Sequence, residues 1–123
     1  MSFVMKTLEQ MNAVHFEKPE RISYVCFSSE DGTSLGAGLC EIPVGSSNEN
    51  HVHETADEVI HIIEGTFRFV FPDEEVIMRP KDCIYIPRGL WHQIFNAGDV
   101  PATHTYVFTD TKSTDLIINR YKK

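Results

Sequence analysis

The sequence has few cysteines, and their arrangement does not predict disulfide bonds. Three occur among 123 residues, at widely separated positions and without a Cys-x-x-Cys pair: Cys26, Cys40 and Cys83. An odd number of dispersed thiols argues against the disulfide framework of a small secreted domain. We therefore expect reduced thiols and a cytoplasmic protein.

Long apolar runs and an excess of positive charge are also missing. No run reaches the roughly eighteen apolar residues of a membrane-spanning helix, and the first residues lack the apolar stretch of a secretory signal. Eleven Lys and Arg face eighteen Asp and Glu, which gives a formal net charge of −7. Because phosphate contacts need clustered Lys and Arg, we expect neither a nucleic-acid nor a membrane partner.

The chain has enough apolar material for one folded domain. Hydrophobic residues make up 41% of the sequence and include eight phenylalanines. No repeat, low-complexity tract or Pro/Gly/Ser-rich linker divides it. Length and continuity predict one domain over residues 1–123.

Short apolar runs that alternate with turn residues predict an all-β architecture. We expect eight strands, at residues 21–28, 35–43, 58–64, 66–71, 76–79, 83–86, 91–95 and 103–109. Only residues 7–12 have a helical pattern, and that segment is short. Eight short strands are typical of a small antiparallel β-barrel of the double-stranded β-helix or jelly-roll kind.

The most informative residues are three histidines and one glutamate. His51 and His53 lie two residues apart, so both project from one face of an extended segment. Glu58 follows after four residues that can form a turn and return its carboxylate to that face. His92 ends a second segment, Pro87-Arg88-Gly89-Leu90-Trp91-His92. Three imidazoles and one carboxylate are a suitable ligand set for a divalent transition metal.

The residues around these four form two spaced motifs. The first reads Gly45, five residues, His51-x-His53, four residues, Glu58, six residues, Gly65. The second reads Lys81, five residues, Pro87-x-Gly89, two residues, His92, three residues, Asn96. The chain resembles the cupins, whose two motifs have these residue types at these spacings. It departs at Lys81, where the family usually has a glycine that shapes a turn.

The resemblance implies a single-domain cupin barrel with a bound metal. It makes His51, His53, Glu58 and His92 the metal ligands. Four protein ligands leave two open positions on an octahedral ion, which favours Mn²⁺, Fe²⁺ or Ni²⁺, with Zn²⁺ and Cu²⁺ as alternatives. The resemblance also implies a homodimer, because small cupins commonly pair through sheet faces and exchanged terminal strands.

Strand alternation predicts which side chains face the interior. If Glu58 points inward, so do Ile60 and Ile62, and with Ile94 we expect these isoleucines to form a dry wall around a substrate. The alternate residues of the same strand then point outward: Val59, His61 and Ile63. These make an apolar stripe suited to a second subunit and place His61 away from the metal.

Two further residues are candidates for proton transfer. His104 and Tyr106 share one strand face with Phe108, but the turn at residues 96–101 leaves the direction of that face open. If it points inward, His104 and Tyr106 are the candidate catalytic residues, acting as general acid or base.

The site favours an enzyme acting on a small anionic or enolisable metabolite. Three neutral imidazoles, one carboxylate and a dication sum to about +1, which suits an oxygen anion as ligand. The reaction would be an oxygenation if the metal is iron, and otherwise a lyase or isomerase reaction. The alternative is a non-catalytic module that binds a small molecule or sugar and has a structural metal. Quercetin-type dioxygenases, oxalate-degrading cupins and sugar isomerases share the ligand set, so the resemblance does not choose among them.

Overall fold

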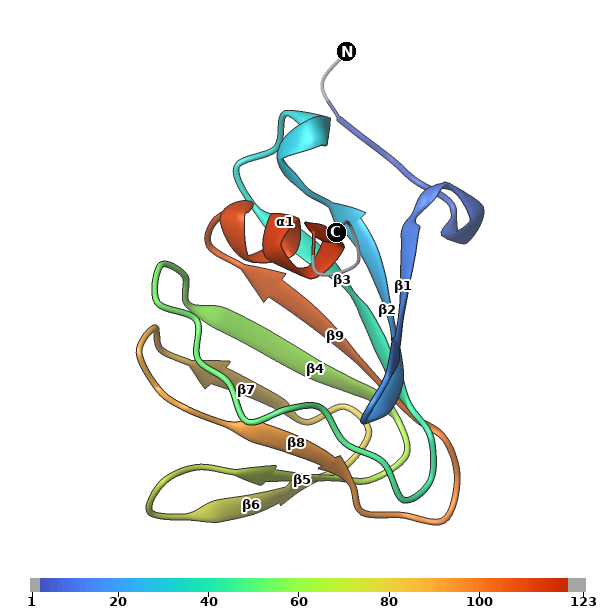
Figure 1. The fold of residues 1–123 in the computed structure, drawn as a ribbon, viewed down its shortest axis with the longest axis vertical. Helices are drawn as coiled ribbons and strands as arrows, with labels where there is room; N and C mark the ends of the chain where they lie inside the picture. Colours follow the sequence, from blue (N-terminus) through green and yellow to red (C-terminus); the bar gives the residue numbers. More distant parts are fainter. Residues whose placement is uncertain (1–2, 120–123) are drawn as a thin grey trace.

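The computed structural model describes residues 3–119, whose strands form two antiparallel sheets (Figure 1). The six-stranded sheet has the order β1-β2-β3-β9-β4-β7, and the three-stranded sheet has the order β6-β5-β8. The strands are β1 (Asn12–Glu17), β2 (Glu20–Phe27), β3 (Gly36–Ile42), β4 (Glu58–Glu64), β5 (Phe67–Val70), β6 (Glu75–Met78), β7 (Cys83–Ile86), β8 (Gln93–Asn96) and β9 (Ala102–Phe108). The other elements are two 3-10 turns, η1 (Leu8–Gln10) and η2 (Ser29–Asp31), and one helix, α1 (Lys112–Asn119).

The eight predicted strands correspond to β2 through β9, and their ends differ by no more than two residues. The helical pattern at residues 7–12 corresponds to the short 3-10 helix η1, after which the chain enters β1 at Asn12. Two elements were not predicted. β1 buries only Val14, and the fully buried residues of α1 are the polar Ser113 and Thr114. The apolar patterns of the two segments are short, with Val14 and Phe16 in β1 and residues 116–118 in α1, and the sequence analysis did not recognise them.

The sheets are all-β and consistent with a jelly roll, but they are not closed into the predicted barrel. Every strand in residues 3–119 pairs within its own sheet. The chain leaves the larger sheet after β4, where the pairing with β9 shifts register between Ile62 and Glu64. Gly65 then adopts a φ of 80°, and a Cβ there would lie 2.6 Å from the Cβ of Ala102. This broken register and sharp turn redirect the chain into the smaller sheet, which leaves the two sheets unjoined.

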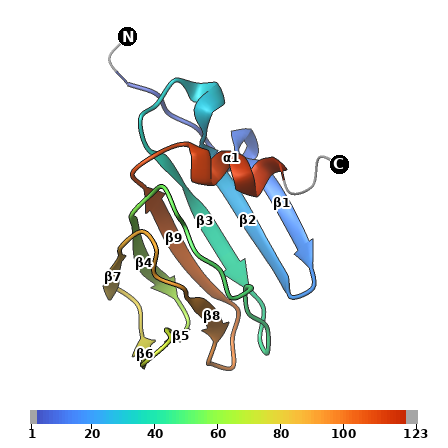
Figure 2. The same ribbon diagram turned by 60° about the vertical axis from the view of Figure 1, so that its left-hand side comes forward.

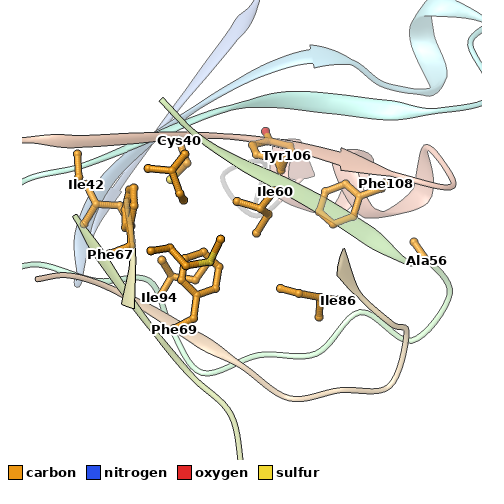
Figure 3. Close-up of a cluster of buried hydrophobic side chains, with 13 residues drawn as sticks. Cys40, Ile42, Ala56, Ile60, Phe67, Phe69, Ile86, Ile94, Tyr106 and Phe108 are labelled. Carbon is orange, nitrogen blue, oxygen red and sulfur yellow. The ribbon is translucent and has the colours of Figure 1, made fainter. Parts of the chain in front are cut away.

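The inner faces of the two sheets meet in an apolar core (Figure 3). Ile60 and Ile62 of β4 contribute from one side, and Phe67 and Phe69 of β5 contribute from the other. All four side chains are almost completely buried, so the core fixes the distance between the sheets. Glu58, on the same face of β4, is also buried, which confirms the predicted alternation.

The opposite face of β4 is exposed, as the alternation predicted. Val59 is 41% and Ile63 54% exposed, and His61 lies between them on that face. Val59 is opposite Tyr85 of β7 on one side and Val107 of β9 on the other, and both of these side chains are also exposed. His61 is therefore directed away from the interior.

The face of β9 that the sequence left open points inward. His104 and Tyr106 are each 3% exposed and lie beside the core. In the register of the sheet, His104 is opposite Cys40 and Tyr106 is opposite Gly38 of β3. A Cβ on Gly38 would collide with the phenol group of Tyr106, so this glycine makes room for the tyrosine.

The helix α1 lies across one end of β2 and β3 (Figure 2). The amide of Gly36 donates to the carbonyl of Asp110 (2.9 Å), and the amide of Ser29 donates to the Asp115 carboxylate (2.9 Å). These contacts anchor the helix over the inner face of the sheet. No helix in residues 3–119 is both long and apolar enough to cross a bilayer. The three cysteines are free thiols, as expected.

Lys81 occupies a left-handed conformation that favours glycine. Its φ is 79°, in the turn that leads to β7, so the chain keeps the turn without the usual residue. We expect Lys81→Gly to raise the free energy of unfolding by about 0.5–1 kcal/mol, since relief of the Cβ clash exceeds the added backbone entropy of the unfolded chain. Urea denaturation measures the change. Lys81→Ala is the control because it keeps the Cβ, and equal stability of the two variants would contradict the explanation.

Candidate metal centre

Two segments far apart in sequence place the predicted ligands together. The connection from β3 to β4 runs beside β8, with isolated bridges from Ser47 to Phe95 and from His51 to His92. His51 and His92 exchange two backbone hydrogen bonds, each 2.9 Å long. The amide of Gly89 also donates to the carbonyl of His53 (2.9 Å). This strand-like pairing sets the histidines of both motifs side by side, and Glu58 enters from the first position of β4.

The four side chains converge on one small volume. His51, His53 and His92 each offer a ring nitrogen, and these three atoms lie within 4.8 Å of one another. The Nε2 atoms of His51 and His53 are 3.1 Å apart. Oε1 of Glu58 lies 3.5 Å from Nε2 of His53 and 3.4 Å from Nε2 of His92. The histidine cluster can therefore hold a metal ion, with a carboxylate oxygen next to it.

Backbone carbonyls fix the orientation of two of the rings. Nδ1 of His51 donates to the carbonyl of Glu49 (2.7 Å), and Nδ1 of His92 donates to that of Leu90 (2.9 Å). Because a carbonyl only accepts, the proton of each neutral ring lies on Nδ1 and the lone pair lies on Nε2. Metal-binding histidines commonly have such a partner on their second nitrogen.

Two buried atoms in the cluster lack a hydrogen-bond partner within the described residues. They are Oε1 of Glu58 and Nε2 of His92. Their 3.4 Å contact is not a hydrogen bond, because the proton of His92 is engaged with Leu90. Leaving a buried polar atom unsatisfied costs about 1–3 kcal/mol. A cation between these atoms would satisfy both, so the donor set fits a divalent metal.

The environment favours the protonation states that metal binding requires. Burial, with repulsion from His92 and His53, lowers the pKa of His51 to about 3. Burial also lowers the pKa of His53. For Glu58, burial raises the pKa, but His92 and His53 outweigh it and leave the pKa below its usual value. Metal ligation needs neutral imidazoles and an ionised carboxylate, and these directions supply both.

A cavity of about 320 Å³ extends from the cluster along the inner face of the six-stranded sheet to α1. His51, His53 and Glu58 line it, and so do His104 and Tyr106. The predicted dry wall is only partly correct. Ile94 lines the cavity, whereas Ile60 and Ile62 pack in the core between the sheets. The other apolar lining residues are Phe16, Val52, Phe108, Leu116 and Ile117.

Burial gives His104 and Tyr106 opposite proton-transfer properties. Nδ1 of His104 donates to the carbonyl of Thr105 (2.9 Å), while its Nε2 is buried without a hydrogen-bond partner among the described residues. Burial lowers the pKa of His104 and raises that of Tyr106. The hydroxyl of Tyr106 is 2.7 Å from that of Ser23. At neutral pH, His104 is therefore a neutral acceptor and Tyr106 a protonated phenol.

The sequence analysis did not predict that the strand β2 and the helix α1 line the cavity. Arg21 and Ser23 line it from β2, and α1 adds Ser113, Leu116 and Ile117. Arg21 and Ser23 lie two apart in a strand that was predicted, so parity alone places them on one face. The available signal was that Arg21 and Ser23 alternate on the same strand face as the apolar Val25. For the helix, the available signal was the short apolar run at residues 116–118.

The chain belongs to the cupin family. The family model for the cupin domain matches residues 38–108, which is more than half of the chain and includes all four proposed ligands. That stretch runs from within β3 to the end of β9 and includes the larger part of both sheets.

Individual relatives match over part of their length. The tetracenomycin polyketide synthase protein TcmJ of Streptomyces glaucescens is 35% identical over 75 residues, which cover 61% of this chain and 50% of that protein. The chain spans about half the length of two of the curated relatives that it matches.

Solved structures share the fold. The "predicted oxalate decarboxylase" of Thermotoga maritima has a TM-score of 0.75 and 20% identity, over 85% of this chain and 97% of that one. The polyketide cyclase RemF of Streptomyces resistomycificus has a TM-score of 0.74 and 21% identity, over 86% and 78% of the two chains. At these identities the likeness extends to the fold only.

The buried state of His104 predicts a pH-dependent contribution to stability. Because burial lowers its pKa in the folded protein, the unfolded chain takes up a proton there first as the pH falls below about 6.5. The wild type should therefore lose stability relative to His104→Gln, by up to about 1.4 kcal/mol per pH unit below 6.5. Denaturant titrations between pH 7.5 and 5 measure this difference. The exposed His15→Gln, on β1, is the control, and a difference independent of pH for His104→Gln would exclude the effect.

Proposed function

We propose that this cupin binds one divalent transition metal through His51, His53, Glu58 and His92. The main support is the convergence of three imidazole nitrogens, two of them oriented by backbone carbonyls, beside a buried carboxylate oxygen with no hydrogen-bond partner in the described residues. Mn²⁺, Fe²⁺ or Ni²⁺ is favoured because four ligands leave two positions of an octahedral ion for water or substrate. Zn²⁺ and Cu²⁺ are the alternatives.

The metal content of ligand variants tests this assignment. We expect about one metal ion per wild-type chain and strongly reduced content in His53→Ala and His92→Ala, because each removes a donor. Elemental analysis is performed on protein whose fold is verified by circular dichroism. His61→Ala is the control, since its side chain is on the outer face of β4. Unchanged metal content in both ligand variants would falsify the assignment.

The proposed activity is a metal-dependent reaction of a small anionic or enolisable metabolite. When bound, the metal would polarise a carbonyl or carboxylate oxygen of the substrate. The chain itself supplies an apolar lining, through Phe108 and Ile117, that lowers the local dielectric and so strengthens interactions between charges. Two matched proteins have polyketide in their names, and polyketide ketones beside CH₂ groups are enolisable.

His104 and Tyr106 are proposed to move protons in this reaction. The neutral Nε2 of His104 accepts a proton from the substrate, and the Tyr106 hydroxyl donates one or hydrogen bonds to a substrate oxygen. Both side chains line the same cavity as His51, His53 and Glu58. Their opposite pKa shifts suit one acceptor and one donor near neutral pH.

Turnover assays separate the reaction types and test the proton carriers. Carboxylates, enols and sugars are screened under air and under argon, with each metal restored in turn. An oxygenase needs dioxygen and Fe²⁺, whereas a lyase or isomerase works without oxygen. Tyr106→Phe should lower the rate by roughly 10²–10⁴ and leave substrate affinity nearly unchanged. An unchanged rate would remove Tyr106 from the reaction.

The alternative function is a non-catalytic module that binds a small molecule or sugar, with a structural metal. One observation favours it: the Tyr106 hydroxyl already has a protein partner in Ser23, at 2.7 Å, which gives the tyrosine a structural reason to be buried. Ligand binding without turnover under every combination of metal and atmosphere would support this alternative.

We also propose that the protein is a homodimer that covers the outer face of β4. Val59, Ile63 and Tyr85 are 41%, 54% and 59% exposed there, which leaves a neighbouring group of apolar side chains in water. The paired substitution Val59→Lys and Ile63→Lys should convert the dimer into a monomer. Light scattering at micromolar concentration measures the mass, with the exposed Val100→Lys as control. A wild-type species of strictly 14.0 kDa would end the proposal.

A further inference from the structure

Two hydroxyl groups in the wall of the cavity form a pair that has one proton to spare. Oγ of Ser23 lies 2.7 Å from the hydroxyl of Tyr106, and both side chains are buried and line the cavity. Each hydroxyl has one proton and two lone pairs. Their mutual hydrogen bond uses one proton, and the other has no acceptor among the residues that the structure describes. The pair can therefore donate one hydrogen bond to a molecule in the cavity.

His104 offers the complementary group. Its Nδ1 donates to the carbonyl of Thr105 (2.9 Å), so the neutral ring has a lone pair on Nε2. That Nε2 is buried in the cavity wall and has no hydrogen-bond partner in residues 3–119. Buried polar side-chain atoms in folded proteins nearly always have a partner. The free lone pair therefore indicates a donor that comes from outside these residues.

The register of the sheet brings the donor and the acceptor to one part of the cavity. Ser23 of β2 is opposite Cys40 of β3, and Cys40 is opposite His104 of β9, so the three form one row across the sheet. Strands lie about 4.8 Å apart, which separates Ser23 and His104 by about 10 Å at the backbone. The phenol of Tyr106 crosses over Gly38 to reach the Ser23 end of this row. Only the small Cys40 occupies the position between the two ends.

A hydroxyl group is the chemical complement of this arrangement. Its oxygen can accept from the Ser23–Tyr106 pair while its proton is donated to Nε2 of His104. A ketone or a carboxylate accepts but cannot donate, an ammonium group donates but cannot accept, and a methylene group does neither. Each missing hydrogen bond leaves a buried polar atom unsatisfied, so the site discriminates among these groups.

This row lies at a distance from the proposed metal ligands. Glu58 is opposite Phe108 of β9, whereas Ile62, four residues further along β4, is opposite His104. At about 3.4 Å per residue, four residues span about 13 Å along the strand. A ligand oxygen at the metal ligands and a hydroxyl group at His104 are therefore separated by several carbon atoms.

We propose that Ser23, Tyr106 and His104 form a subsite for a neutral alcohol or enol hydroxyl group. The hydroxyl pair donates to the oxygen of this group, and the group donates its own proton to His104. That the other end of the ligand is an oxygen anion at the metal rests on the proposed function. The substrate is then a hydroxy acid, or a similar anion, whose hydroxyl group lies several carbons from the anionic end.

Ligands that differ in a single group test this subsite. Heptanoate, the hydroxyheptanoates with the hydroxyl group on the third to the sixth carbon, and the corresponding oxoheptanoates are titrated by calorimetry, with each enantiomer measured separately. The variants are His104→Leu and the double variant Ser23→Ala with Tyr106→Phe. Ser28→Ala is the control, because Ser28 is also a buried serine but does not line the cavity. Fold and metal content are measured for every protein.

The two variants should affect different pairs of ligands. For at least one hydroxyl position, His104→Leu should lower the preference for the hydroxy acid over the oxo acid by about tenfold to a hundredfold, because only the hydroxyl donates. The double variant should lower the preference for the oxo acid over heptanoate by about tenfold and leave the preference for the hydroxy acid over the oxo acid unchanged. Ser23→Ala and Tyr106→Phe alone each keep one hydroxyl and should retain part of the preference for the oxo acid. Ser28→Ala should change neither preference.

Three results would overturn the inference. The first is a wild type that prefers no hydroxy acid over its oxo and unsubstituted partners, since water then satisfies the buried groups. The second is an equal loss of all three ligands in both variants, which is the pattern of a purely structural role. The third is a full effect of the double variant in Tyr106→Phe alone, which would exclude Ser23.

Neutral ligands separate the subsite from the metal. Pentan-3-ol and pentan-3-one have no anionic oxygen, and their binding to metal-free protein is compared by ligand-observed NMR. The preference for the alcohol should persist there and should be lost in His104→Leu. A wild type that binds no metal but keeps this preference would refute the proposed function and support the subsite. Equal binding of the two neutral ligands would count against the subsite whatever the metal content.

Discussion

The two backbone hydrogen bonds between His51 and His92 are the interaction on which the site depends. They join the β3–β4 connection to the segment before β8, and so unite two motifs that are far apart in sequence. The same connection then delivers Glu58 to the first position of β4, in the other sheet. The cluster therefore lies where the two sheets approach each other, and the core of Ile60, Phe67 and Phe69 beside it resists any change in their separation.

The buried polar atoms of the cluster cost folding free energy unless a cation binds between them. It buries a carboxylate oxygen and an imidazole nitrogen without hydrogen bonds in the described residues, while carbonyls of Glu49 and Leu90 turn two Nε2 lone pairs toward the same point. Buried polar atoms of this kind are uncommon in proteins and generally have a functional reason. The backbone thus fixes the orientations of these two rings before an ion binds, which lowers the conformational entropy lost on metal binding.

The strand β9 connects this centre to the rest of the cavity. His104 and Tyr106 project from it beside the core, and Gly38 on β3 leaves the space that the phenol occupies. Arg21 on β2 supplies a positive charge beyond them, whereas α1 is anchored at the other end of the sheet, where Gly36 of β3 is opposite Phe108 of β9. The inner face of the six-stranded sheet therefore contains the Glu58 carboxylate, two groups with opposite pKa shifts and a buried cation.

The sequence by itself determined local features: eight strands, the shared face of His51 and His53, and the alternation along β4, because side-chain direction within one strand follows from its period. Only the tertiary structure decided that His104 and Tyr106 face inward. The turn before β9 breaks the alternation of side-chain directions along the chain, and the pairing of β9 with β3 on one side and β4 on the other determines which of its faces points inward. It also decided that Arg21 shares their cavity and that the two sheets remain unjoined. The strand β1 and the helix α1 have only short apolar patterns and are completed by contacts with the rest of the fold, so the sequence analysis did not find them.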